Sequence, residues 1–245
     1  LSLNSDKPMD IFGEKWHGYV DKIRAGFAPL HEDDVTVLCG DLSWGMSLEE
    51  SLEDFRFIHA LPGKKILMKG NHDYWWNTVA KMQRFFDENG LDSFEILHNN
   101  CCLYGDVALC GTRGWFYEED RGEHSAKIFN RELIRLETSL KAAGEREKFC
   151  FLHYPPLYQG YRCQEIIDLM KRYGVTRCYY GHLHGGSHRL AVTNVKLNNM
   201  HRHPGGESVL QGLRGLFQPC GERRQLMEKT ADLPAKEPAQ KKKPR

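Results

Sequence analysis

The chain has 245 residues, a formal net charge of +1, 40% hydrophobic residues and 27% charged residues. This length suits one domain of generous size, or one domain followed by a tail. The near-neutral charge excludes a strongly basic protein whose positive electrostatic field binds polyanions. The lack of 18 consecutive apolar residues argues against a transmembrane helix.

The eight cysteines favour a reducing compartment. Four of them, Cys39, Cys110, Cys150 and Cys178, lie in apolar strand-like runs, where free thiols behave as small hydrophobic residues. No Cys-x-x-Cys pair is present, so a structural zinc ribbon is not expected. From this cysteine usage we expect a cytoplasmic protein, and no secretory signal is visible.

Strand-like runs alternate with helical patterns along most of the chain. The strand-like runs are Val35–Cys39, Lys65–Met68, Val107–Cys110, Lys148–Leu152 and Arg177–Tyr180. The helical patterns are Lys15–Ala25, Leu48–Ala60, Thr78–Asn89, Ala126–Ala143 and Gln164–Tyr173. Because the strands are apolar throughout, the alternation predicts an α/β fold whose sheets are covered on both faces.

Polar motifs follow four of these strands directly. They are Gly40-Asp41, Gly70-Asn71-His72-Asp73, His153-Tyr154-Pro155-Pro156 and Gly181-His182-Leu183-His184. In α/β folds the groups of the active site gather on loops at the carboxyl ends of strands, so these side chains are expected to converge. The glycines before Asp41, Asn71 and His182 predict tight turns that bring the side chains into one cavity.

Asp, Asn and neutral His together offer oxygen and nitrogen ligands without thiolate, a set that suits Mn, Fe or Zn. Two such cations about 3.5–4 Å apart form the clamp used in phosphoryl-ester hydrolysis. Each motif alone has a plainer interpretation, since Gly-Asp after a strand is usually a turn and a lone His153 is usually a packing residue. The hypothesis depends on all four motifs following strands in this order.

These motifs, together with Gly-Asp-Leu-Ser-Trp, Gly-Thr-Arg-Gly-Trp and His-Tyr-Pro-Pro, resemble the calcineurin-like metallophosphoesterases over residues 1–197. The sequences of these motifs are similar to those of a bacterial subgroup of single-domain predicted phosphohydrolases. The resemblance implies a four-layer sandwich of two mixed β-sheets flanked by helices. It also implies a binuclear metal centre that hydrolyses phosphate mono- or diesters, as a phosphatase or phosphodiesterase, with metal-bound hydroxide as the nucleophile.

The resemblance assigns five residues to two divalent metal ions, for which Mn, Fe and Zn remain open. Asp41 matches the carboxylate that bridges the two ions. Asn71, His153 and His182 match the other ligands of one ion, and His184 matches a ligand of the second.

Three further residues match positions around the substrate. His72 matches the family histidine that protonates the leaving oxygen, and Asp73 would orient His72. Arg113, in Gly-Thr-Arg-Gly-Trp, is a candidate phosphate clamp because a guanidinium binds phosphate with two donors. The alternative for Arg113 is a surface or loop-bracing role.

The family's first motif, Asp-x-His, is not found before Asp41. The chain begins Leu1-Ser2-Leu3-Asn4-Ser5, which is similar to the segment just after that motif. We therefore expect a fragment that lacks the first strand, with its second metal site incomplete. The alternative function is an impaired or non-catalytic metal-binding remnant. In addition, Trp44 stands where many family members have Asp.

Residues 198–245 hold ten Lys or Arg and five Asp or Glu and show no convincing strand. They are predicted to form a divergent basic tail, disordered at least from Leu233 on. Contact between its lysine cluster and nucleic acid or phospholipid is a weaker alternative, as is a nucleic-acid-binding function for the whole chain. The aromatic runs Tyr74-Trp75-Trp76 and Trp115-Phe116-Tyr117 favour packing over stacking against a substrate base or sugar.

Overall fold

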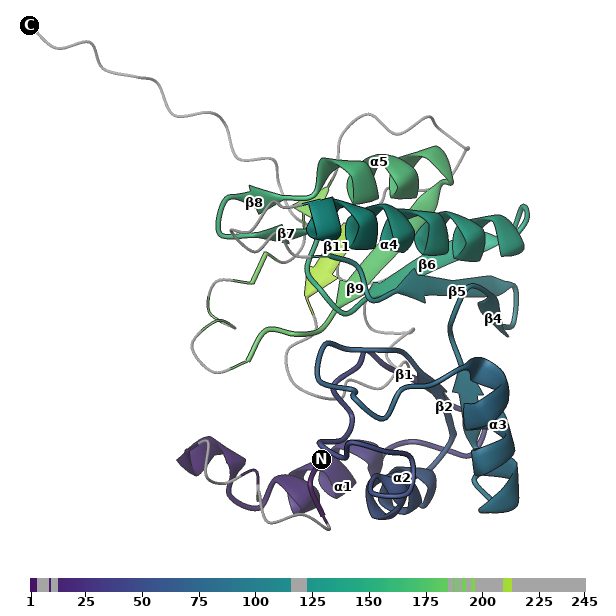
Figure 1. The fold of residues 1–245 in the computed structure, drawn as a ribbon, viewed down its shortest axis with the longest axis vertical. Coiled ribbons are helices and arrows are strands. Elements are labelled where there is room, and N and C mark those ends of the chain that lie inside the picture. Colours follow the sequence, from purple (N-terminus) through teal and green to yellow (C-terminus); the bar gives the residue numbers. More distant parts are fainter. Residues whose placement is uncertain are drawn as a thin grey trace, which may run out of the picture.

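The computed structural model describes residues 1–3, 9, 13–115, 123–184, 187, 189, 191–192, 195–196 and 209–212. Two β-sheets lie face to face between two sets of helices, which gives four layers (Figure 1). The predicted α/β sandwich is confirmed.

The smaller sheet contains three parallel strands in the order β1-β2-β3. Their bounds are β1 Val35–Leu38, β2 Lys64–Leu67 and β3 Phe94–Ile96. On its outer face lie the helices of the first half of the chain, which are η2 Glu14–Trp16, a 3-10 turn, and α1 Tyr19–Phe27, α2 Leu52–His59 and α3 Val79–Glu88.

Within the described ranges the larger sheet has six strands in the order β10-β11-β9-β6-β5-β4. Their bounds are β4 Cys101–Tyr104, β5 Val107–Thr112, β6 Glu147–Leu152, β9 Val175–Tyr180, β10 Val195–Lys196 and β11 Val209–Gly212. Helices α4 Glu123–Ala142 and α5 Gln164–Arg172 cover its outer face, and a small hairpin, β7 Leu157–Tyr158 with β8 Tyr161–Arg162, precedes α5. The larger sheet is mixed as predicted, whereas the described strands of the smaller sheet are all parallel.

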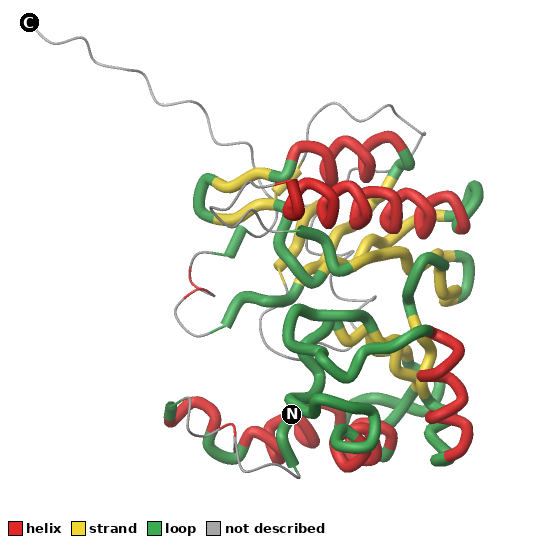
Figure 2. Tube along the Cα trace, viewed as in Figure 1, coloured by secondary structure: helices red, strands yellow, loops and turns green. Residues whose placement is uncertain are grey.

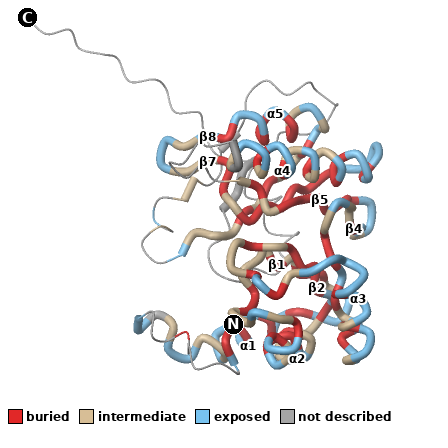
Figure 3. Tube along the Cα trace, in the orientation of Figure 1, coloured by how far each residue is buried: buried red, intermediate tan, exposed pale blue. Residues whose placement is uncertain are grey.

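Strand periodicity explains why the described residues form three separate apolar cores. Successive side chains of a strand point to opposite faces, so in β5 Ala108 and Cys110 pack under α4 and α5. Val107 and Leu109 instead face the smaller sheet and pack between the two sheets. A third core joins the smaller sheet to α1, α2 and α3. Figure 3 shows that buried residues concentrate in the strands and on the inner faces of the helices.

The predicted elements are present with small shifts of their ends, and some strands were missed. The helix expected over Lys15–Ala25 is instead η2 followed by α1, because Gly18 adopts a left-handed conformation between them. Residues 198–245 were expected to hold no strand, and this is wrong, because β11 pairs with β9 there. The rest of that segment lies outside the described residues, so its prediction as a tail stays a prediction.

None of the helices in the described ranges is long and apolar enough to cross a bilayer.

Candidate metal centre

Four loops from two sheets meet at one edge of the sandwich. The loops that follow β1 and β2 lie opposite those that follow β6 and β9 (Figure 2). Because β1 and β2 run parallel, and β6 and β9 run parallel, each pair ends at the same edge of its sheet. The convergence predicted from the sequence is therefore present.

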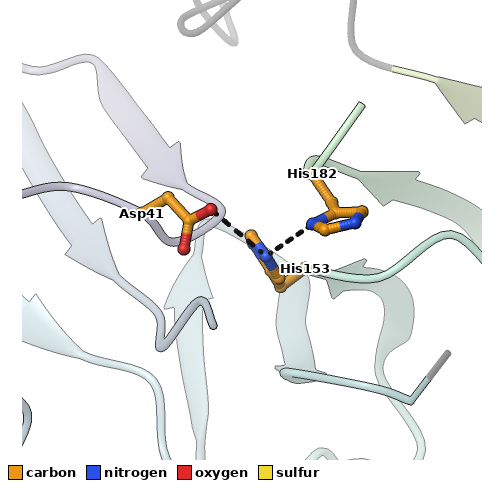
Figure 4. A group of neighbouring side chains, drawn as sticks. All are labelled: Asp41, His153 and His182. Carbon is orange, nitrogen blue, oxygen red and sulfur yellow. Dashed lines mark hydrogen bonds and ion pairs between the residues drawn. The ribbon is translucent and has the colours of Figure 1, made fainter. Parts of the chain in front are cut away.

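Four polar side chains from these loops bring their ligand atoms together. The ligand atoms of Asp41, His153 and His182 all lie within 4.8 Å of one another (Figure 4). Asn71 completes the group, with its Oδ1 2.6 Å from His153 Nε2 and 3.1 Å from His182 Nδ1. We call these four residues the ligand group.

The distances within the ligand group suit a shared cation. The Nε2 of His153 is 3.5 Å from Asp41 Oδ2 and 3.2 Å from His182 Nδ1. Ligand atoms bound about 2.0–2.2 Å from one metal ion are separated by roughly 3–3.5 Å from each other. The separations of 3.1–3.5 Å fit a single divalent ion, whereas Asn71 Oδ1 and His153 Nε2, 2.6 Å apart, would have to move apart for both to bind it.

The hydrogen bonding of His153 leaves its metal-facing nitrogen, Nε2, without a proton. Its Nδ1 lies 2.8 Å from the carbonyl oxygen of Cys39, which can only accept, so Nδ1 carries the proton. The lone pair of Nε2 then faces the Asn71 oxygen, also an acceptor in the orientation the structure gives this amide. Two facing lone pairs repel unless a cation lies beside them, and a histidine ligand held by a backbone carbonyl is typical of metal sites.

Burial keeps both histidines of the group neutral. It lowers the pKa of His153 to about 4, and the Cys39 carbonyl opposes this only in part. Burial also lowers the pKa of His182 to about 4, with the neighbouring His153 as the next cause. Neutral imidazole is the form that binds a metal ion, so both side chains are ready to bind at neutral pH.

Two ligand-group residues have strained backbones. Asp41 has a φ of 58° and His182 a φ of 67°, in the left-handed region that residues with a Cβ rarely adopt. Such strain collects at functional sites because the surrounding structure holds it there. The sequence predicted a tight turn at Gly181, but the left-handed residue is the histidine after it.

Close approach of two loops explains the glycines before Asp41 and Asn71. Gly40 has a φ of 93°, which suits glycine. A Cβ on Gly70 would collide with the carboxylate and backbone nitrogen of Asp41. The absence of a side chain at Gly70 therefore lets the loop after β2 press against the candidate ligand of the loop after β1.

The contacts of Asp73 are not those expected from its predicted role, which was to orient His72. The buried carboxylate accepts backbone N–H bonds from Asp41, Leu42 and Gly70 at 2.6–2.8 Å. It also accepts the indole N–H of Trp75 at 3.0 Å. Burial raises the pKa of Asp73, and these hydrogen bonds oppose the rise. Asp73 thus ties the two loops together, and its carboxylate oxygens are engaged away from the His72 ring.

His72 lies at the rim of the ligand group. Its backbone N–H donates to Asp41 Oδ1 at 2.8 Å, which aims the other carboxylate oxygen at His153. Its ring lies 4.9 Å from the Trp44 ring, and its Nδ1 is 3.4 Å from the Tyr74 hydroxyl. Neither aromatic neighbour was predicted from the sequence, although the Gly-Asp-Leu-Ser-Trp motif contains Trp44.

The other two predicted site residues lie outside the ligand group. His184 is exposed, although it is near enough to influence the pKa of His182. Arg113 follows β5 and its carbonyl oxygen accepts the backbone N–H of His153. Its guanidinium lies 3.6 Å from Glu132, a buried carboxylate of α4 that the sequence analysis did not single out.

Comparison with known proteins gives one clear match. The sequence model described as calcineurin-like phosphoesterase matches residues 14–186. No curated protein matches the chain.

Solved structures resemble the chain only weakly. One crystal structure superposes with a TM-score of 0.45 at 15% identity, over 69% of this chain and 80% of the other. The protein TT1561 of Thermus thermophilus gives 0.41 at 16% identity, over 67% and 75%. A protein of unknown function, AQ665 from Aquifex aeolicus, gives 0.35 at 17% identity, over 69% and 67%.

Proposed function

The chain belongs to the calcineurin-like phosphoesterase family, and from this premise we propose that it hydrolyses phosphate mono- or diesters with divalent metal ions. The observation that carries the proposal is the ligand group, in which four ligand atoms from four loops point at one place. A divalent cation held there polarises a phosphoryl oxygen and lowers the pKa of a bound water.

The residues of the chain have distinct parts in this proposal. Asp41, Asn71, His153 and His182 hold the ion, and Asp73 keeps the two loops that carry the first two of them at a fixed distance. His72 lies beside the ligand group with its ring exposed in part, where it can give a proton to the leaving oxygen.

The proposal also includes a second metal ion. Asp41 would be shared between the two ions, and His184 would contribute to the second. Manganese, iron and zinc all suit oxygen and nitrogen ligands. The absence of disulfides among the described cysteines fits a cytoplasmic location, which also belongs to the proposal.

One observation favours a second candidate function. Among the described residues, His184 is exposed and does not join the ligand group. A chain that holds one ion firmly and the second weakly would bind metal but turn over slowly, because the two-metal clamp needs both ions.

An activity assay on purified chain tests the proposal. We expect hydrolysis of an aryl phosphate with added Mn²⁺, and loss of that activity with a chelator. Equal hydrolysis with and without chelator would contradict it. Tight metal binding without hydrolysis would favour the second candidate.

A further inference from the structure

A group of basic side chains continues the rim beside the ligand group. It consists of Lys69 after β2, His98 after β3, Arg113 after β5 and Arg135 on α4, which we call the basic cluster. In the sheets, β3 neighbours β2 and β5 neighbours β6. His98 and Arg113 therefore lie one strand further along the same edge than the ligand group, and Lys69 lies on the loop that carries Asn71.

Glu132 is the carboxylate that pairs with the two arginines of this cluster. Glu132, 1% exposed, accepts from Arg135 at 2.6 Å through Oε1 and from Thr112 at 2.6 Å through Oε2. Arg113 reaches the same Oε1 only at 3.6 Å. Both oxygens of Glu132 are thus hydrogen-bonded to other residues, and the Arg113 guanidinium has no close contact with either of them.

The remaining basic groups repel one another. Arg113 and Arg135 both repel Lys69, whereas Asp73 and, more weakly, Glu132 attract it. Burial lowers the pKa of His98, and Arg135 is the next cause. Two arginines and a lysine beside two carboxylates, Glu132 and Asp73, leave an excess of positive charge, which an anionic ligand would neutralise.

Three buried N–H donors of this region have no hydrogen-bond acceptor within the described ranges. They are Arg113 Nε, Trp115 Nε1 and Trp76 Nε1. The Arg113 guanidinium lies 5.7 Å from the centroid of the Trp115 ring, and the Trp76 ring lies 6.1 Å from that of His98. Buried donors are nearly always paired, so three unpaired donors beside excess positive charge point to an oxygen-rich ligand.

We propose that the basic cluster binds a second phosphate group of the substrate, beside the one that is hydrolysed. This rests on the proposed function, and it narrows the substrate class to organic phosphates that carry two phosphate groups. Adjacent strands are about 4.8 Å apart, so the two groups would be roughly 5–10 Å apart. The side chains of Arg113 and Arg135 are 21% and 31% exposed, which leaves the cluster open to a ligand.

The first test measures anion binding without metal. Metal-free chain is titrated with inorganic phosphate by calorimetry, and Arg135→Gln is compared with Arg131→Gln, a change at an exposed arginine of the same helix. We expect binding to weaken about tenfold in Arg135→Gln only, the typical effect of losing one charged hydrogen bond. Thermal melting verifies folding, and Arg135→Lys, which keeps the charge, is expected to bind more tightly than Arg135→Gln. Absent or equal binding in all chains would overturn the proposal.

The second test identifies the source of the anion. Mn²⁺-loaded chain is assayed with a nucleoside 5′-monophosphate and with the matching 3′,5′-bisphosphate, which differ by one phosphate group. We expect a higher kcat/KM for the bisphosphate, and a smaller preference in Arg135→Gln than in Arg131→Gln. A chain that binds free phosphate but shows no preference would refute the substrate assignment. If no ester is hydrolysed, the proposed function fails, whereas the titration still decides whether the anion site exists.

Discussion

The Nδ1 of His153 donates a hydrogen bond of 2.8 Å to the carbonyl oxygen of Cys39, which joins the ends of β6 and β1. This bond fixes the ring so that Nε2 faces Asp41, Asn71 and His182. A backbone carbonyl of one sheet thus sets the protonation of a candidate ligand from the other. The packing of the two sheets and the chemistry of the site are therefore coupled.

The loop-tying role of Asp73 predicts a large loss of stability when its charge is removed. In Asp73→Asn the amide nitrogen would face backbone N–H donors, and buried donors would lose their acceptor. We expect the free energy of unfolding to fall by roughly 2–5 kcal/mol, measured by urea denaturation of metal-free chain. Asp92→Asn, at a side chain 95% exposed, is the control and should change little. Equal stability of the two variants would contradict the role.

His72 is expected to act in turnover and not in metal binding. Its ring contacts Trp44 and Tyr74 and is not part of the ligand group. His72→Ala should lower kcat by about 10²–10⁴-fold, the usual contribution of a general acid. Elemental analysis should find the metal content of the wild type. Loss of metal in this variant would refute the assignment.

The place of Asp41 in the ligand group predicts unequal effects of two ligand changes. Asp41→Ala should remove metal more completely than His184→Ala, because Asp41 belongs to the ligand group whereas His184 is exposed. Metal content of the two purified variants decides this. Similar losses in both would count against a central role for Asp41.

The low pKa of His153 predicts a stability change with pH in metal-free chain. Its pKa is about 4 in the folded state, below the ordinary value of 6.5, so the unfolded state binds the proton more readily. The contribution of His153 to the free energy of unfolding is therefore fully present above about pH 6.5. It is lost as the pH drops towards 4, which lowers the free energy of unfolding by on the order of 3 kcal/mol.

Comparison with His153→Gln isolates this effect. The raised pKa of Asp73 acts in the opposite direction, because the folded state then binds the proton more readily. Melting curves with chelator between pH 8 and pH 4 should fall more steeply in wild type than in His153→Gln. Parallel curves would show that His153 is not held neutral.

Much of the fold was predictable because its central strands are apolar on both faces. The hydrophobic pattern of runs such as Val107–Cys110 and Lys148–Leu152 differs sharply from that of the helices around them. The structure places β5 and β6 there. The missed strands are short or carry less apolar patterning, like the three residues of β3 and the four of β11. For these the partner strand, and not the local sequence, determines the conformation.

The convergence of the candidate site was predictable for a similar reason, since its motifs directly follow strands. The detailed contacts were not. Asp73 adjoins His72 in sequence, which suggested a contact between them, whereas its four partners are Asp41 and Leu42 on another loop and Gly70 and Trp75 on its own. The left-handed conformation of His182 and the basic cluster around Glu132 likewise depend on tertiary packing that no local pattern encodes.

The most direct test of the account is the position of a metal ion in crystals grown with Zn²⁺. Anomalous scattering at the zinc edge locates the ion without assumptions about activity. The account predicts a peak bound at about 2.0–2.2 Å by Asp41, Asn71, His153 and His182, and its loss in His153→Ala. A peak elsewhere with these four side chains unbound, or the same peak in His153→Ala, would contradict it.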